Sequence, residues 1–210
     1  MNIPIVVVQV FCQKLTVLES TLKTMFLNAG HLLYMVHSIE FQKWGVPHMH
    51  ILLKFECDYI HLDDIDAIVS AEMPSDPSNV ELIQNLMMHN HHSHSRPPSK
   101  YFQKVDDNGH QICHFGYPHP LQSVTSIYNE GWPHYQRQNN SDEMIVPHCL
   151  PLLQTFQCHL NFEVMNTSHL FQYLFKYIHK GKTHMLTFSI NTNSLCRPQS
   201  CVLLCSFQQF

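Results

Sequence analysis

The sequence is poor in charged residues. Only 13% of its 210 residues are Asp, Glu, Lys or Arg, and 12 basic side chains are outnumbered by 16 acidic ones. With histidine neutral, the formal net charge is −4. These numbers exclude a strongly basic protein that binds nucleic acid through its overall charge, so any contact with nucleic acid has to come from a local patch.

Paired cysteine motifs and long apolar runs are also missing. The eight cysteines include no C-x-x-C pair, and no secretory signal is recognisable before them. Reduced thiols are therefore expected rather than a disulfide framework. The apolar run Ile3–Val10 is interrupted by Gln9 and is too short to span a membrane, so no membrane contact is expected.

A complete phosphate-binding loop for ATP is absent as well. Gly181-Lys182-Thr183 matches the end of the pattern G-x-x-x-x-G-K-[ST], but the position of the first glycine holds Lys176. ATP hydrolysis and helicase activity by that route are therefore not expected of this chain.

Histidine, in contrast, is abundant, with 18 residues. The most informative pair is His48 and His50, because side chains two residues apart on a β-strand point to the same face. The residues that alternate with them are all apolar: Met49, Ile51, Leu53 and Phe55. This pattern predicts a strand over 48–55 with one face in the core and two neighbouring nitrogen ligands for a divalent metal on the other.

A second strand is predicted over 32–42, joined to the first by a turn. In an antiparallel hairpin across that turn, paired residue numbers would sum to about 90. Glu40 would then lie opposite His50, and Gln42 opposite His48. Either Glu40 or Gln42 could supply an oxygen ligand beside the two imidazoles.

The remaining pattern predicts an α+β fold, with a mainly antiparallel central sheet that carries the His-x-His strand and is flanked by helices. A long irregular insertion is expected over 89–142, and the tail 191–210 has no clear periodicity. Further elements are predicted as helices over 4–28, 63–71, 80–88 and 166–180, and as a strand over 160–164.

The helix predicted over 166–180 has two distinct faces. At about 100° per residue, its apolar side chains fall in one sector and predict a buried stripe: Leu170, Phe171, Leu174, Phe175 and Ile178. Tyr173 and Tyr177 lie outside this sector, one turn apart, and Lys176 and Lys180 flank them. Two phenols and two ammonium groups thus share a face that suits a phosphate.

The segments 39–53 and 173–181, which hold the histidine pair and the two tyrosines, resemble the Helitron helicase-like N-terminal domain. This is the replication-initiator, His-hydrophobic-His endonuclease region of Helitron rolling-circle transposases. Segments 8–15, 68–74 and 158–164 are also similar to that family. The resemblance implies an endonuclease domain over 1–190, with a degenerate insertion over 89–142, followed by an unmatched tail over 191–210.

The resemblance implies metal-dependent nicking of single-stranded DNA, with strand transfer through a 5′-phosphotyrosine, as in rolling-circle transposition. It implies single-stranded DNA as partner, a helicase domain acting in trans, and a nuclear location. The roles it implies are Tyr173 and Tyr177 as nucleophiles, Lys176 and Lys180 as DNA phosphate contacts, and His48, His50 and Glu40 (Gln42 as substitute) as ligands of Mg²⁺ or Mn²⁺.

The chain departs from the family in its middle region. Met88–His94 replaces a cysteine-containing stretch, Ser99–Lys104 keeps part of a Tyr-Phe-Pro-Lys segment, and His134–Gln138 resembles a worn arginine-rich run. Two alternatives follow. One is a catalytically dead Helitron remnant that folds or binds DNA without cleavage. The other is a metal-binding protein with no DNA role, using the cluster His89, His91, His92 and His94.

Overall fold

The computed structural model describes residues 5–26, 30–41, 47–56, 62–89, 104–105, 109, 111–113, 115–127, 133–166, 185–190 and 201–208. The elements are α1 (Ile5–Met25), β1 (Leu32–Phe41), β2 (Pro47–Phe55), α2 (Leu62–Asp66), α3 (Pro77–Leu86), β3 (Lys104–Val105), β4 (Gln111–Ile112), β5 (Ser126–Ile127), β6 (Pro133–His134), the 3-10 turn η3 (Asn140–Asp142), α4 (Leu150–Phe156), β7 (His159–Asn166), β8 (Met185–Ile190) and β9 (Cys201–Gln208). The predicted α+β class is confirmed.

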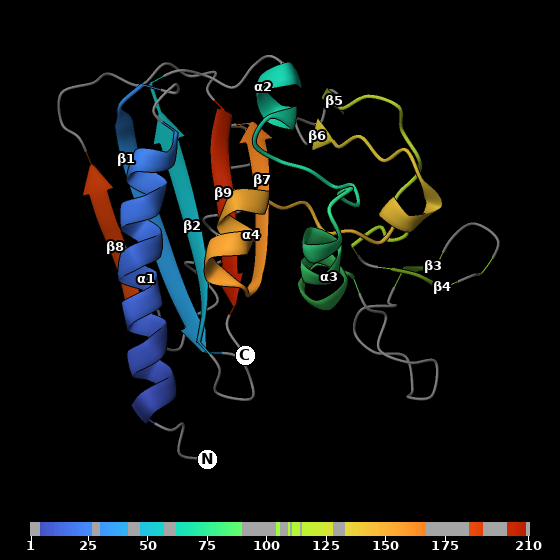
Figure 1. The fold of residues 1–210 in the computed structure, drawn as a ribbon. Helices are drawn as coiled ribbons and strands as arrows, with labels where there is room; N and C mark the ends of the chain where they lie inside the picture. Colours follow the sequence, from blue (N-terminus) through green and yellow to red (C-terminus); the bar gives the residue numbers. More distant parts are fainter. Residues whose placement is uncertain are drawn as a thin grey trace.

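Five strands form one sheet in the order β7-β9-β2-β1-β8, and each pair of neighbours is antiparallel. Helices α1 and α4 cover one face of this sheet (Figure 1). Helices α2 and α3 and the short strands β3 to β6 lie beyond the β7 edge (Figure 1). One face of the sheet is therefore packed by helices, and the β2 residues on the opposite face, among them His48 and His50, are also buried.

The core lies between α1, α4 and the sheet. On α1, the fully buried Leu18 and Leu22 recur at a helical spacing, and this stripe packs on the sheet. On β2, the apolar residues predicted for the core are buried, with Met49, Ile51 and Leu53 at 0% exposure. Burying each such side chain contributes roughly 1.5–3 kcal/mol, so this contact anchors β2.

Helix α1 confirms the helix predicted over 4–28, and its composition is unusually apolar. Of the described helices, α1 is long and apolar enough to cross a membrane, judged by length and composition alone. Core helices and signal sequences share that property. The N-terminal turns of α1 expose Ile5 and Val6, whereas Leu15 and Leu18 pack on the sheet.

The β1–β2 hairpin is formed as predicted, but the predicted register is wrong by two residues. Glu40 pairs with His48 and Ser38 with His50, so paired numbers sum to 88. The alternation of side chains fixes which face a residue occupies, whereas the connecting turn sets the register. A shift of two residues preserves the face, so Glu40 stays on the same side as the two histidines.

Several helices begin or end at residues other than those predicted, for local reasons. Helix α3 begins at Pro77, because the Asp76 side chain accepts a hydrogen bond from the Asn79 N–H and caps it, so the helix begins before the predicted start at 80. Helix α2 ends at Asp66, well before the predicted 71, because the chain turns extended and Ser70 pairs with His148. Helix α4 was not predicted.

The predicted strand over 160–164 is confirmed as part of β7, which extends to Asn166. The helix predicted over 166–180 was expected to begin at this residue. Asn166 instead ends a strand, and the rest of that predicted helix lies outside the described residues.

Strands β8 and β9 were not predicted either. β9, drawn from the 191–210 tail, pairs with β2 on one side and β7 on the other. Its sequence Cys-Val-Leu-Leu-Cys-Ser-Phe-Gln does not alternate strictly between apolar and polar residues, so the period of two that predicted β2 is missing here. Residues 201–208 of the tail are thus an integral part of the sheet.

Beyond the β7 edge, Arg137 holds the irregular segments together. Its guanidinium is 3% exposed and donates to the carbonyls of Ala71 (3.3 Å), Ile145 (2.8 Å) and Asp142. The Asp142 carboxylate in turn accepts from the Met73 N–H at 3.0 Å. Arg137 belongs to the segment that resembles an arginine-rich run, but its burial excludes it as a surface contact for DNA.

Candidate metal centre

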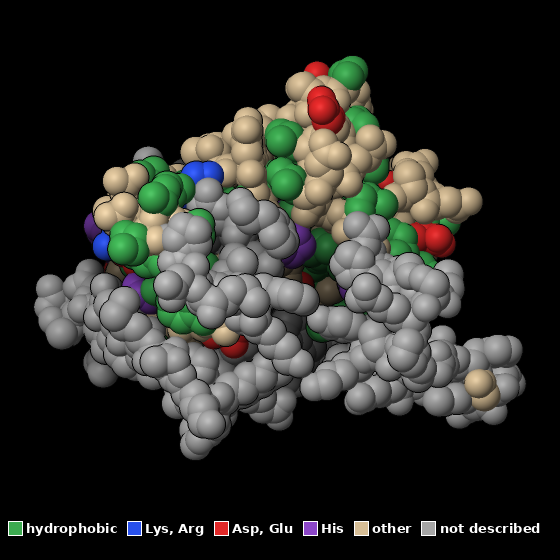
Figure 2. Space-filling view, turned by 90° about the horizontal axis from the view of Figure 1, so that it is seen from below, with side chains coloured by type: hydrophobic (Ala, Val, Ile, Leu, Met, Phe, Trp, Pro, Cys, Tyr) green, Lys and Arg blue, Asp and Glu red, His purple; other side chains and the backbone are tan. Residues whose placement is uncertain are grey.

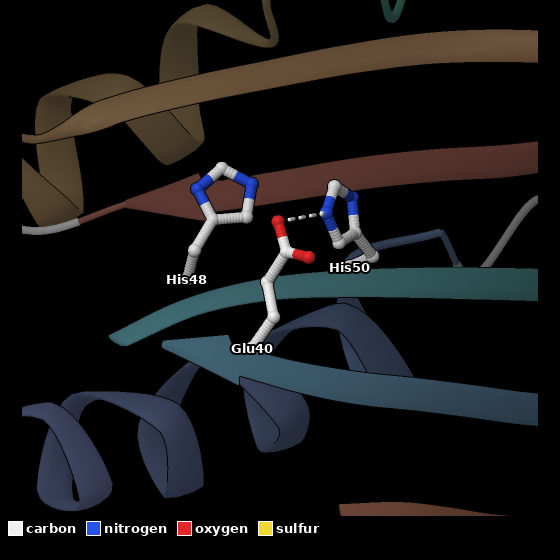
Figure 3. Close-up of side chains that lie close together, drawn as sticks. All are labelled: Glu40, His48 and His50. Carbon is white, nitrogen blue, oxygen red and sulfur yellow. Dashed lines mark ion pairs between the residues drawn. The ribbon is translucent and has the colours of Figure 1, made fainter. Parts of the chain in front are cut away.

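Three potential metal ligands come together on the sheet face opposite α1. His48 and His50 project from β2, and Glu40 projects from the neighbouring strand β1 (Figure 3). Within the described residues they form the one group of three His, Cys, Asp or Glu side chains whose ligand atoms all lie within 4.8 Å of one another. Glu40, His48 and His50, three of the ligands proposed from the sequence, therefore lie together in the structure. Their role as metal ligands stays a prediction.

The geometry of the group follows from the antiparallel register. Glu40 is directly opposite His48, and His50 is its diagonal neighbour. A Glu side chain is long enough to reach that diagonal position. Its Oε1 lies 3.5 Å from His50 Nε2, and its carboxylate lies between the two imidazole rings (Figure 3). The ring centroids of His48 and His50 are 4.5 Å apart.

These donor atoms fit a divalent ion. Metal–ligand bonds of about 2.0–2.2 Å place two ligands on opposite sides of an ion roughly 4.2 Å apart. The largest separation in the group, within 4.8 Å, needs only a small inward movement of the side chains. Two imidazole nitrogens and one carboxylate oxygen suit several divalent metals, including Mn²⁺, Fe²⁺ and Zn²⁺.

The site is sheltered. His48 and His50 are 8% and 7% exposed, and Glu40 is half-buried. Burial strengthens electrostatic attraction between a carboxylate and a cation, because the surrounding dielectric is lower than that of water.

A third imidazole of the hairpin serves a different purpose. His37, on the α1 face of β1, places Nδ1 2.9 Å from Glu19 Oε1. Burial lowers the pKa of His37, and the neighbouring Glu19 carboxylate opposes that shift. His37 therefore ties α1 to the sheet and stays on the opposite face from the candidate metal ligands.

The other predicted site residues are not brought to this group by the described structure. Tyr173, Tyr177, Lys176 and Lys180 lie outside the described residues, as does Gln42. Their predicted roles as nucleophiles, phosphate contacts and substitute ligand stay predictions.

The histidine cluster of the alternative metal site is only partly described. His89 stacks on Tyr117 with ring centroids 4.1 Å apart, and its Nε2 lies 3.4 Å from the Cys113 Sγ. His91, His92 and His94 lie outside the described residues. His89 is therefore engaged in contacts with Tyr117 and Cys113.

Sequence reasoning missed a polar row on β7. Residues His159, Asn161 and Glu163 alternate with the buried Leu160, Phe162 and Val164. The alternation places the three polar residues on the sheet face of His48 and His50. The period of two was visible in the sequence, but the position of β7 in the sheet was not.

Comparison of the chain with models of known protein families, with curated proteins and with solved structures finds no match. The fold and the site by themselves define an α+β protein with a candidate divalent-metal centre on the face of an antiparallel sheet.

Proposed function

We propose that the chain is a metal-dependent endonuclease of single-stranded DNA that nicks and transfers strands through a 5′-phosphotyrosine. The observation that carries the proposal is the convergence of Glu40, His48 and His50 on one buried sheet face. The type of reaction is inferred from the resemblance of the same segment to the Helitron replication-initiator domain. Strand β2, which bears the histidine pair, lies inside the sheet and would hold the metal ligands in place.

The ligand set is proposed to hold Mg²⁺ or Mn²⁺, which when bound would polarise the scissile phosphate and offset its developing negative charge. Two imidazoles favour Mn²⁺ over Mg²⁺, because Mg²⁺ strongly prefers oxygen ligands. Glu40, half-buried between the two rings, contributes the negative charge that draws a cation to this face.

The nucleophiles are proposed to be Tyr173 and Tyr177. The phenolic oxygen of one tyrosine forms a bond to phosphorus while the bond from phosphorus to the 3′ oxygen breaks, and the phenolic proton passes to solvent as the 3′ oxygen takes one up. A phenol with a pKa of about 10 needs a nearby positive charge to stabilise its anion. Lys176 and Lys180 are proposed to provide that charge and to contact phosphates.

Binding of DNA by this chain is expected to depend little on overall charge. In the view from below, the described Lys and Arg side chains that can be seen are few and lie toward one side (Figure 2). The net charge of −4 and the burial of Arg137 agree with this view. The proposal therefore places most of the affinity in the metal and in local contacts.

A covalent-adduct assay tests the proposal. The full chain is incubated with a set of labelled single-stranded oligonucleotides and Mn²⁺, and denaturing gels are read for a protein–DNA band. The proposal expects a band that disappears with chelator, in His48→Ala, and in the double variant Tyr173→Phe with Tyr177→Phe. An adduct that persists in the double variant would show that the tyrosines are not the nucleophiles.

The second candidate is a Helitron remnant that folds and binds DNA without cleaving it. The negative net charge and the buried Arg137 favour this candidate, because both reduce the positive charge available to hold a DNA strand in place. It expects binding of single-stranded DNA but no covalent product with either metal.

A further inference from the structure

The polar row on β7 extends the candidate metal centre across the sheet. Strand β9 lies between β2 and β7, and it pairs Ser206 with His50 on one side and with Asn161 on the other. Asn161 and His50 are therefore two strand spacings apart in the same row and on the same face, roughly 10 Å from each other. This is about the reach of one nucleotide from its phosphate to its base.

The orientation of the Asn161 amide is set by its neighbour. Its Nδ2 donates a hydrogen bond to Glu163 Oε1 at 3.0 Å. A carboxylate accepts hydrogen bonds, so the nitrogen is turned toward Glu163 and the amide oxygen is turned away. Burial raises the pKa of Glu163, while this hydrogen bond opposes the shift.

The amide oxygen, in contrast, accepts no hydrogen bond from the residues that the structure describes. Among the described residues, Asn161 Oδ1 is a buried side-chain atom with no hydrogen-bond donor. Leaving a buried acceptor unpaired costs about 1–3 kcal/mol, so native structures rarely keep one without a reason. A ligand that brings an N–H group to this oxygen would recover that cost.

An aromatic side chain interacts with Glu163, the hydrogen-bond partner of Asn161. Tyr117, whose phenol interacts electrostatically with Glu163, stacks on the His89 ring. Sites for single-stranded nucleic acid combine aromatic rings, which stack on bases for affinity, with oriented amides, whose hydrogen bonds select the base.

We propose that Asn161 selects the base beside the scissile phosphate, with Oδ1 accepting a hydrogen bond from an exocyclic amine. The remaining N–H of Nδ2 stays available for a ring nitrogen, which is the paired contact that Asn makes with adenine. Adenine and cytosine carry the required amine and thymine does not. The inference rests on the proposed function, because it takes single-stranded DNA as the ligand.

Fluorescence anisotropy with short oligomers of dA, dC and dT tests this selection in the full chain with Mn²⁺ present. Wild type is expected to bind dA and dC about tenfold more tightly than dT, the effect of one buried hydrogen bond. Asn161→Ala should reduce this ratio to about one while leaving Mn²⁺ affinity unchanged. The matched control Asn85→Ala, an exposed amide on α3, should keep the wild-type ratio.

A change in the DNA makes the test independent of whether the variant folds. The probe is an oligomer in which each adenine is replaced by unsubstituted purine, the same ring system without the 6-amino group. It should bind wild type about tenfold more weakly than dA. Equal binding of these two oligomers, the same base preference in Asn161→Ala as in wild type, or no binding of any oligomer would each overturn the inference.

The adduct assay separates this inference from the proposed function. Covalent adducts together with a base preference that ignores Asn161 would retain the nickase and reject the base contact. A base preference that requires Asn161, without any adduct, would retain the base contact and reject the nickase.

Discussion

Glu40 Oε1 lies 3.5 Å from His50 Nε2, although the sheet pairs Glu40 with His48. The diagonal reach places one carboxylate between two imidazoles that come from a single strand (Figure 3). Two adjacent strands thus supply all three ligands, and both strands are held from behind by the packing of α1. This arrangement keeps the ligands close together before any metal binds.

The donor set predicts a metal preference. Mn²⁺ is expected to bind at least tenfold more tightly than Mg²⁺, because two of the three ligands are imidazole nitrogens. Competition of each ion against a fluorescent metal indicator would measure the two affinities. Equal affinities would indicate that the imidazoles do not ligate the ion.

The histidine face could be predicted from the sequence because side-chain alternation depends on nothing but the extended backbone. The register could not, since the number of residues in the turn, and not the pattern of the strands, decides which residue faces His48. The position of β7 beside β9 depends on a contact between segments some 40 residues apart, and no local pattern reports it.

Acid is expected to destabilise the fold through His119. Burial and the neighbouring Arg137 lower the pKa of His119 from 6.5 to about 4. The unfolded chain then takes up a proton at a higher pH than the folded chain, so the stabilisation is complete above pH 6.5 and is lost as pH falls toward 4. His37 and His148, whose pKa values are also lowered by burial, act in the same direction.

Urea unfolding at pH 7, 6, 5 and 4 measures this dependence. The free energy of unfolding should fall by up to about 1.4 kcal/mol per pH unit for each histidine that titrates. The variant His119→Gln should show a shallower slope than wild type. Identical slopes in wild type and His119→Gln would contradict the account.

Arg137 is predicted to be essential for the region beyond β7. Arg137→Met removes the donor from three buried carbonyls and should destabilise the protein by about 3–5 kcal/mol, measured by urea unfolding. Arg137→Lys should recover only part of the loss, because an ammonium lacks the planar fork of a guanidinium. Lys23→Met, an exposed change on α1, should shift stability by less than about 0.5 kcal/mol.

Deletion of residues 201–210 is predicted to abolish folding. β9 pairs with β2 and β7, so its loss separates β7 from the sheet and leaves two strand edges unpaired. Circular dichroism and size-exclusion chromatography should show an unfolded or aggregated chain. Deleting only residues 209–210, which removes no residue of β9, should leave the fold intact. A folded, monomeric 1–200 chain would show that β9 is dispensable.

The most direct test of the metal centre is calorimetric titration of Mn²⁺ into the full chain and into three variants. Wild type should bind one Mn²⁺ per chain, and Glu40→Ala and His50→Ala should each weaken binding by at least tenfold, since each removes one of three ligands. Glu81→Ala, which removes an exposed carboxylate on α3, should bind as wild type does. Binding of equal strength in all four proteins would contradict the assignment of Glu40, His48 and His50 as a metal centre.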